Sequence, residues 1–203
     1  MTKSLWAPVA TWSRRPHPAG TPYGVDLSNF QGTLTQATID SLKDQNCSFV
    51  IVQAITGLDG RSYTRQQLQA AVDAGLEVQG YIWCFPGDTE SSLTGRLSMF
   101  DGFAITQLWL DVEQAGVSVQ DVNRALAICD AHIGKKTHIY TGKWFFDQQG
   151  WSGQALWSDR LLWDAHYDGN PDPDANFQPY GGWDRCEIKQ YLSSPMDMNA
   201  RRA

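Results

Sequence analysis

The chain has 203 residues, of which 42% are hydrophobic and 19% are charged, as is ordinary for a globular protein with a real core. The length suits one domain the size of an α/β barrel or a sandwich, or at most two small domains. The formal net charge of -6 argues against a general binder of nucleic acids or anionic membranes, because no basic patch accompanies it.

The cysteines and the N-terminus bear on the compartment. The four cysteines stand far apart in apolar stretches, with no C-x-x-C pair: Cys47, Cys84, Cys129 and Cys186. We expect buried free thiols and synthesis in a reducing compartment such as the cytoplasm. The N-terminus lacks the apolar segment of a signal peptide, and no stretch is long enough to span a membrane. If the protein acts outside its producing cell, it therefore needs another route of release.

Residues 1–21 form a predicted N-terminal arm, rich in proline and polar residues, and residues 22–203 form a single predicted domain. Trp6 and Trp12 are candidate anchors for the arm. We expect the arm to pack along the outside of the domain, and docking into a larger assembly is the alternative.

The first half of the domain alternates predicted strands and helices. They are a short strand from Tyr23 that ends at Asp26, a helix over 36–45, a strand over 49–54, a helix from Thr64 to Gly75, a strand over 78–85 and a helix over 89–100. The run at 49–54 is rich in β-branched residues, as buried parallel strands are. Thr64 to Gln67 has the form of a capping box. The helix after it has an apolar face made of Leu68, Ala71 and Val72.

The second half continues the alternation and then loses its helices. A strand over 108–113 precedes a helix that Ser118 caps and Gly134 closes. A strand over 138–141, a short helix over 143–148 and two last strands over 161–165 and 186–191 follow. This pattern predicts an α/β fold: an irregular parallel (β/α) barrel, similar to a TIM barrel, with incomplete outer helices.

Two acids end the strand at 108–113. Asp111 and Glu113 are two residues apart, so they project side by side from one face of the strand. In a parallel barrel they would lie at the carboxyl end, where such folds gather their chemistry. The more desolvated carboxyl would keep a proton and act as an acid, while the other stays charged. The alternative is an acidic pair that simply enters a solvated loop.

Other acids are predicted to converge at the same end of the barrel, namely Asp26, Asp111, Glu113 and, just after the last strand, Asp197. Tyr81, Tyr140, Trp163 and Gln190 lie at or near the same rim as candidate ligand contacts. Carboxylates surrounded by aromatics and amides suit glycoside hydrolysis, which needs an acid for the leaving oxygen and a negative group for the developing positive charge. Some of the nine tryptophans could offer flat faces to a sugar ring. The four histidines show no ligand spacing, so we expect neither a metal nor a cofactor.

Acidic and amide residues also alternate through the stretch at 168–176. This alternation is similar to a calcium loop, but Pro173 stands at the sixth position and Pro179 at the twelfth, where glycine and glutamate are needed. We expect a proline-stiffened solvated loop. The chain also lacks G-x-S-x-G, a P-loop and a G-x-G-x-x-G after a strand.

Taken in order, several short motifs resemble glycoside hydrolase family 25, the muramidases common among phage endolysins and bacterial autolysins. The resemblance runs from about Tyr23 to Asn199. The matching pieces are Gly24–Gln31, Phe49–Val52, Ala74–Leu76 leading to Gly80–Tyr81, Leu108–Glu113, Ile139–Thr141 with Trp144, Leu162–Trp163 with Ala165 and Tyr167, Gln190–Tyr191, and Asp197–Asn199.

The resemblance implies an irregular β/α barrel that cleaves the β-1,4 bond from N-acetylmuramic acid to N-acetylglucosamine in peptidoglycan. It implies that Glu113 is the general acid/base, and that Asp111 stabilises the transition state or orients the N-acetyl group. Asp26 and Asp197 would form the floor of the site, with Tyr81 beside them. The family is taken to retain anomeric configuration.

Three positions depart from the family pattern. Neutral Gln53 stands where the family has lysine, Ile55 lies nearest the place of a glutamate, and Ile82 replaces a histidine. These changes motivate an alternative function, a weak or inactive glycan-binding or structural module of a phage particle. In either case we expect bacterial cell-wall peptidoglycan as the partner, with no nucleic acid and no membrane insertion. The arm would be the contact to a virion, and the protein would act on the wall after phage release or as part of the particle.

Overall fold

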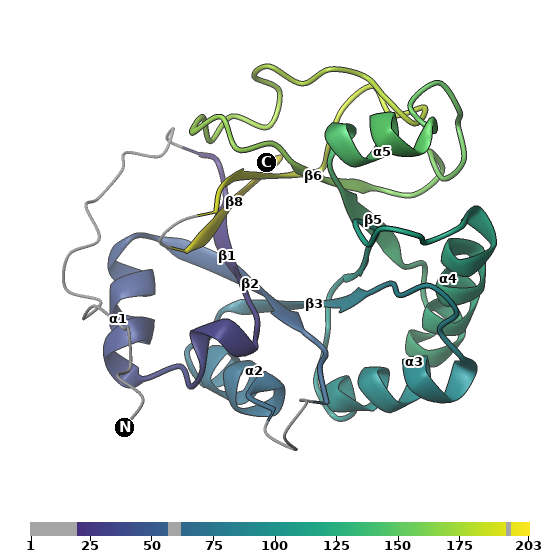
Figure 1. Cartoon of the computed structure of the whole chain (residues 1–203). Helices are drawn as coiled ribbons and strands as arrows, with labels where there is room; N and C mark the ends of the chain where they lie inside the picture. Colours follow the sequence, from purple (N-terminus) through teal and green to yellow (C-terminus); the bar gives the residue numbers. More distant parts are fainter. Residues whose placement is uncertain (1–19, 57–61, 194–195) are drawn as a thin grey trace, which may run out of the picture.

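Eight strands close into one barrel in the computed structural model, which describes residues 20–56, 62–193 and 196–203. The predicted arm therefore lies almost entirely outside the described residues. The strands are β1 (Tyr23–Leu27), β2 (Cys47–Gln53), β3 (Glu77–Trp83), β4 (Leu108–Asp111), β5 (His138–Thr141), β6 (Leu162–Ala165), β7 (Ile188–Leu192) and β8 (Asp197–Arg201). The helices outside them are α1 (Gln36–Asp44), α2 (Thr64–Asp73), α3 (Glu90–Leu97), α4 (Val119–Ile133) and α5 (Lys143–Gln149), with short 3-10 helices η2 (Asn29–Gln31) and η3 (Ser98–Phe100). Figure 1 shows the helices around the outside of the strands.

The barrel is parallel from β1 to β7 but not at its closure. Strand β8 pairs antiparallel with both β7 and β1. The predicted all-parallel barrel is wrong at this point, and Asp197 begins the eighth strand instead of following the last one. Residues 166–187, between β6 and β7, are all described and contain no helix, which confirms the expected gap in the outer layer.

Capping side chains start most of the helices. The hydroxyls of Thr35, Thr89 and Ser118 each accept a hydrogen bond from the backbone N–H three residues later, at 3.2 Å. Asp121 completes a capping box by accepting the Ser118 N–H at 3.0 Å. Gly134 ends α4 with φ 67°, a left-handed conformation that favours glycine.

The predicted capping box at Thr64 is wrong. Thr64 is the first residue of α2, after Tyr63, and its hydroxyl donates to the Gln53 carbonyl at 2.7 Å. The Gln67 amide donates to two carbonyls in the segment after β1, at 2.8 Å each. Both side chains therefore donate to carbonyl groups outside α2, on β2 and in the segment after β1, and neither caps the helix. Val72, expected on the buried face of this helix, is exposed.

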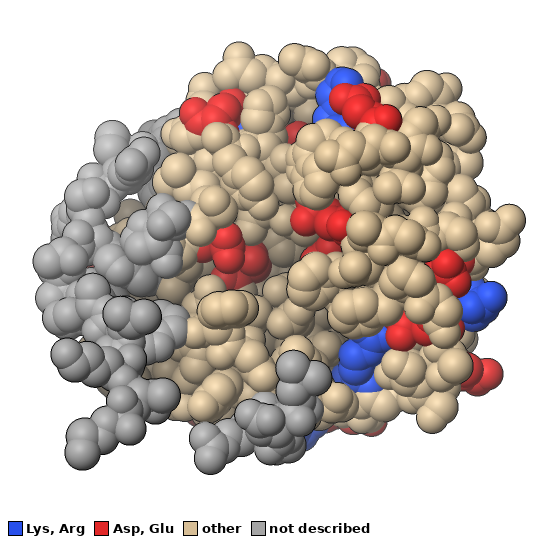
Figure 2. Space-filling model, viewed as in Figure 1, with Lys and Arg blue, Asp and Glu red and all other residues tan. Residues whose placement is uncertain are grey.

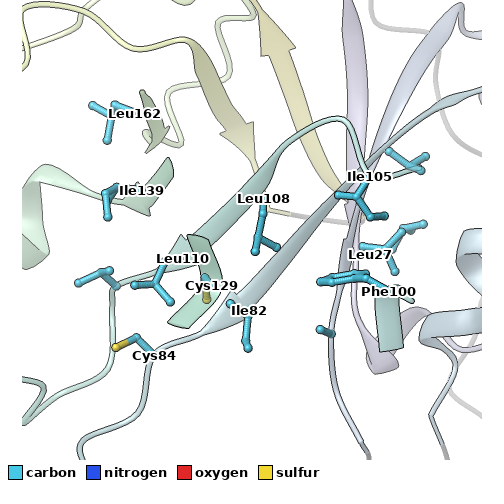
Figure 3. Packing of buried hydrophobic residues seen from close by; sticks show 14 of the residues in the cluster. Leu27, Ile82, Cys84, Phe100, Ile105, Leu108, Leu110, Cys129, Ile139 and Leu162 are labelled. Atoms are coloured by element: carbon cyan, nitrogen blue, oxygen red, sulfur yellow. The ribbon is translucent and has the colours of Figure 1, made fainter. Parts of the chain in front are cut away.

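Alternation along the strands produces two apolar layers. Side chains that point outward pack against the helices, as Figure 3 shows for part of this layer. Its labelled members include Leu27, Ile82, Leu108, Leu110, Ile139 and Leu162. The alternate residues fill the barrel interior: Phe49, Ile51, Tyr81, Trp109, Tyr140, Trp163, Ala165 and Ile188. The period of two residues thus gives each strand an outer and an inner face, and strands β2 to β7 contribute the apolar inner residues.

An ion pair crosses the interior at the amino end of the parallel strands. Arg201 donates to both carboxylate oxygens of Glu77, at 2.8 and 2.9 Å, and its guanidinium lies 4.9 Å from the centre of the Phe49 ring. The Gln79 amide bridges Glu77 and the indole N–H of Trp109. The barrel interior is therefore filled at this end, and the predicted site lies at the opposite end.

The four cysteines are buried free thiols, as expected. Among the described residues, no helix combines the length and the apolar character needed to cross a membrane.

Candidate active site

The four acids singled out in the sequence come together at the carboxyl end of the parallel strands. Asp26 lies near the end of β1, Asp111 ends β4, and Glu113 follows two residues later. Because β8 is antiparallel, its first residue, Asp197, is the register partner of Asp26. Figure 2 shows two groups of acidic side chains near the middle of the viewed face, with lysines and arginines farther out.

Amide side chains hold Asp26. Its Oδ1 accepts hydrogen bonds from Gln190 Nε2 at 2.8 Å and from Asn199 Nδ2 at 2.7 Å. Burial raises the pKa of Asp26 well above its usual value, and the neighbouring Asp197 raises it further, while the two amides act in the opposite direction. The two amide donors favour the ionised form of Asp26, against the larger effect of burial.

Two tyrosines fix the orientation of the Gln190 amide. Tyr140 and Tyr167 both donate to Gln190 Oε1, at 2.7 and 3.0 Å, so the amide nitrogen faces Asp26. Burial raises the pKa of the Tyr81 hydroxyl well above its usual value, and the charges of Asp26, Asp111 and Asp197 raise it further. Its hydroxyl therefore stays protonated and can donate to a substrate oxygen.

Asp111 and Glu113 lack such support. Among the described residues, Asp111 Oδ1 and Glu113 Oε1 are buried atoms without a hydrogen-bond partner. Burial raises the pKa of Asp111 well above its usual value, with further contributions from Glu113 and Asp26. Burial also raises the pKa of Glu113 to about 7, and the charge of Asp164 adds to it. Glu113 is therefore mostly protonated below about pH 7 and can act as an acid.

Burial raises the pKa of Asp197 to about 6. With Asp26, Asp111 and Glu113 close by, each ionised carboxylate disfavours ionisation of the others. Burial thus raises the pKa of all four carboxyl groups at the mouth of the barrel, with repulsion between them adding to it at Asp26 and Asp111, and the predicted division between an acid and a charged partner stays a prediction.

The four predicted ligand contacts differ in position. Tyr140 and Gln190 join the polar network around the acids, and Tyr81 packs against the Trp163 ring, although little of each is exposed. Trp163 is 1% exposed, and its indole N–H donates to Asn199 Oδ1 at 2.8 Å. Its ring centroid lies 4.3 Å from that of Tyr140. Trp163 therefore packs against the polar network that holds Asp26, and its contact with a ligand stays a prediction.

Sequence reasoning did not single out Asp164 and Tyr167 as site residues. Asp164 is buried on β6, and Oδ1 accepts a hydrogen bond from the Tyr180 hydroxyl at 2.8 Å. Burial raises its pKa. An acid inside an apolar strand, one residue from its carboxyl end, is the signal that could have identified it. Tyr167 belongs to the matched motif, but no pattern shows that its hydroxyl reaches Gln190.

Exposed aromatic rings surround the mouth. Those of the described residues all lie at or just after the carboxyl end of a parallel strand: Phe30, Trp83, Phe85, Trp144 and Tyr167. Rings in such positions offer flat apolar faces to a sugar.

The stretch at 168–176 encloses a lysine. Three successive side chains, Asp168, Asn170 and Asp172, each accept the backbone N–H two residues later. Lys189, 1% exposed, donates to Asp168 Oδ2 at 2.8 Å and to the Ala175 carbonyl at 2.9 Å. The expected loop is therefore organised around a buried ammonium group and is not simply solvated. No cluster of three or more metal-ligating side chains occurs in the described part of the chain.

The departures from the family pattern occupy different places. Gln53 is buried on β2, where its register partner is Tyr81. Ile82 points outward into the layer beneath the helices, so it does not face the acids. The neutral residue at 53 thus lies beside Tyr81, one of the predicted site residues.

Comparison with known proteins agrees with this geometry. The model of the family "Glycosyl hydrolases family 25" matches residues 25–199. Two Dictyostelium discoideum proteins are each 30% identical to the chain. For "Probable GH family 25 lysozyme 3" the match covers 83% of this chain and 37% of that protein, and for "Probable GH family 25 lysozyme 2" it covers 83% and 82%.

Solved structures show the same fold. A family GH25 lysozyme from Aspergillus fumigatus matches with a TM-score of 0.69 at 20% identity, over 90% of this chain and 94% of that chain. The catalytic domain of endolysin ply40, from bacteriophage P40 of Listeria monocytogenes, matches with a TM-score of 0.69 at 20% identity, over 92% and 96%. The irregular α/β barrel predicted from the sequence is confirmed, and with the family model matching nearly all of the barrel, this chain belongs to glycosyl hydrolase family 25.

Proposed function

We propose that this chain is a muramidase that hydrolyses the β-1,4 bond between N-acetylmuramic acid and N-acetylglucosamine in peptidoglycan. The lysozyme names of its relatives support the substrate class. The observation that carries the proposal is Glu113, a carboxyl with a pKa of about 7 beside Asp111 at the open end of the barrel.

Glu113 acts as the general acid. Its carboxyl proton passes to the glycosidic oxygen as the bond to the anomeric carbon breaks, and the resulting carboxylate then takes a proton from the attacking water. Burial keeps the proton on Glu113 in the free enzyme near neutral pH, so the group is ready for the first step.

The other acids oppose the positive charge that develops on the sugar ring. Asp26 has two amide donors, and Asp197, with a pKa of about 6, is mostly ionised at neutral pH. Asp111 Oδ1 has no partner among the described residues, so it can accept the N–H of the substrate's acetamido group. That contact would orient the acetamido oxygen toward the anomeric carbon.

Tyr81, Tyr140 and Gln190 are the proposed contacts to the sugar at the cleavage point. Tyr140 and Gln190 are held by the network that also holds Asp26, and Tyr81 packs edge-on against Trp163 with ring centroids 5.9 Å apart. The three side chains are therefore preorganised before substrate binds. The exposed aromatic rings around the mouth would stack on neighbouring sugars of the glycan strand.

The alternative is a barrel that binds wall glycan without cleaving it, as a module of a phage particle. Gln53 motivates it, since a neutral buried side chain next to Tyr81 replaces the charge that the family pattern has there. In this alternative the N-terminal arm docks to the virion.

A reducing-end assay on purified peptidoglycan separates the two functions. Wild type is expected to release new muramic-acid reducing ends, and Glu113→Gln is expected to release none while keeping the wild-type circular dichroism spectrum. Glu90→Gln, an exposed glutamate on α3, is the matched control and should keep full activity. If folded wild type releases no new reducing ends but binds the wall saturably, the result would favour the binding module.

A further inference from the structure

A cavity of about 300 Å³ opens beside the catalytic mouth, between the end of β5 with α5 and the loop after β6. Its lining includes Trp144, Asp164, His166, Tyr167, Gln178 and Tyr180. Tyr167 also contacts Tyr140 and Gln190 in the catalytic network, so the cavity borders the proposed cleavage point.

The carboxylate of Asp164 lies on the inner side of this cavity and is 3% exposed. The Tyr180 hydroxyl donates to Oδ1 at 2.8 Å, whereas His166 Nδ1 lies 3.8 Å from Oδ2, too far for a hydrogen bond. No lysine or arginine of the described residues forms an ion pair with Asp164. A buried carboxylate in this state is costly unless a cation joins it.

The neighbouring lysines are already paired. Lys143, which also lines the cavity, lies 2.9 and 2.8 Å from the two carboxylate oxygens of Asp147. Lys189 is bound inside the loop by Asp168. Both lysines are therefore bound to other carboxylates, and the ion-pair partner of Asp164 among the described residues is His166, which carries a charge only when protonated.

The outer walls suit a cation as well. Trp144 and Tyr167 are 46% and 50% exposed, so parts of their rings are open to a ligand. The faces of aromatic rings attract cations, and the effect adds to that of a carboxylate in the same cavity. A neutral hydroxyl could bind these groups too, but it would add no positive charge to offset that of Asp164.

We propose that this cavity binds a protonated amine carried by the substrate, with Asp164 as the counter-ion and Trp144 and Tyr167 as its aromatic walls. The inference rests on the proposed function, since the amine would belong to peptidoglycan near the cleaved bond. Two parts of that polymer can supply it, a glucosamine residue that has lost its acetyl group or the side-chain amine of a diamino acid in the stem peptide.

Calorimetric binding to the Glu113→Gln protein tests the proposal without interference from hydrolysis. The probes are a glucosamine tetramer, the same tetramer fully N-acetylated, and a short lysine-containing peptide, at about pH 6, below the usual pKa of such amines. At least one amine probe is expected to bind about tenfold or more tightly than the N-acetylated tetramer, the range of a charge-assisted hydrogen bond. Preference for the glucosamine tetramer assigns the amine to the glycan, and binding of the peptide assigns it to the stem.

Two variants added to this protein locate the binding. Asp164→Asn is nearly isosteric and should abolish the preference for amines. Gln178→Lys adds a positive charge at an exposed rim position, where folding is not at risk, and should weaken only the amine probes. Asp159→Asn, an exposed carboxylate paired with Lys136, is the control and should change nothing.

The proposal is overturned if neither amine probe outbinds the N-acetylated tetramer, or if Asp164→Asn and Gln178→Lys leave the preference intact. Failure of the muramidase proposal is a separate result, because it appears as the absence of new reducing ends from wild type.

Discussion

Replacing Glu113 by glutamine is expected to stabilise the folded protein at alkaline pH, although it removes the proposed catalytic acid. Burial, with a contribution from Asp164, raises the pKa of Glu113 from 4.5 to about 7. The folded protein therefore holds this proton more tightly than the unfolded chain does. The stabilisation is complete below pH 4.5 and is lost as the pH rises to about 7, where the folded protein must also ionise the buried group.

The size of the effect follows from the pKa. A rise from 4.5 to about 7 corresponds to about 3 kcal/mol of unfolding free energy, at about 1.4 kcal/mol for each tenfold change in proton affinity. Between about pH 4 and about pH 8, ionisation of Glu113 should lower the unfolding free energy of wild type by this amount. Glu113→Gln should not show this loss, because its amide does not ionise.

Urea unfolding at those two pH values measures the difference. The gap in unfolding free energy between Glu113→Gln and wild type should be about 3 kcal/mol larger at the higher pH. Glu90→Gln, at an exposed site, serves as the control and should follow wild type at both. A gap that is equal at the two pH values would refute the claim that Glu113 is buried with a raised pKa.

Three further predictions address charge and packing. Asp164→Asn should lower the pKa of Glu113 and move the alkaline limb of the pH–activity profile to lower pH. The shift should be less than half of the rise from 4.5 to about 7, since burial is the larger cause. Lys189→Met leaves its loop without the buried ammonium group and should lower the unfolding free energy in urea by about 3–5 kcal/mol. Gly80→Ala, whose Cβ would lie 2.5 Å from an aromatic ring, should cost about 1–3 kcal/mol, whereas Gly95→Ala in the open on α3 should stabilise by about 0.5–1 kcal/mol, both measured by urea unfolding.

Each of these has an outcome that contradicts it. An unchanged alkaline limb in Asp164→Asn would mean that its charge does not reach Glu113. Wild-type stability of Lys189→Met would show that the loop does not depend on the lysine. Equal effects of the two glycine changes would show that the close packing at Gly80 is absent.

The sequence predicts those parts of the barrel whose pattern is local. Apolar β-branched runs mark the parallel strands, and Ser118 and Gly134 mark the ends of α4 because capping depends on near neighbours. Asp111 and Glu113 are predicted together because two residues of spacing place them on one face of an extended chain. Such signals need no knowledge of the rest of the molecule.

Strand β8 escapes prediction because its inner face is polar. Asp197, Asn199 and Arg201 point into the barrel, where they meet partners from distant strands, so the segment has no apolar alternation. Asp164 is missed for a similar reason, because Tyr180, which binds it, comes sixteen residues later from the helix-free loop. At Thr64, a barrel carbonyl takes the hydroxyl that the local pattern assigns to the helix end.

The reversed last strand also decides where the chain enters and leaves the barrel. Tyr23 is paired with Ala200, so the first and last strands begin and end together beside the Glu77–Arg201 ion pair, at the end remote from the acids. A tag, a surface linker or a second protein joined after Ala203 would therefore leave from the closed end. The barrel can be immobilised through its C-terminus with its mouth facing outward, toward a polymer too large to enter any pocket whole.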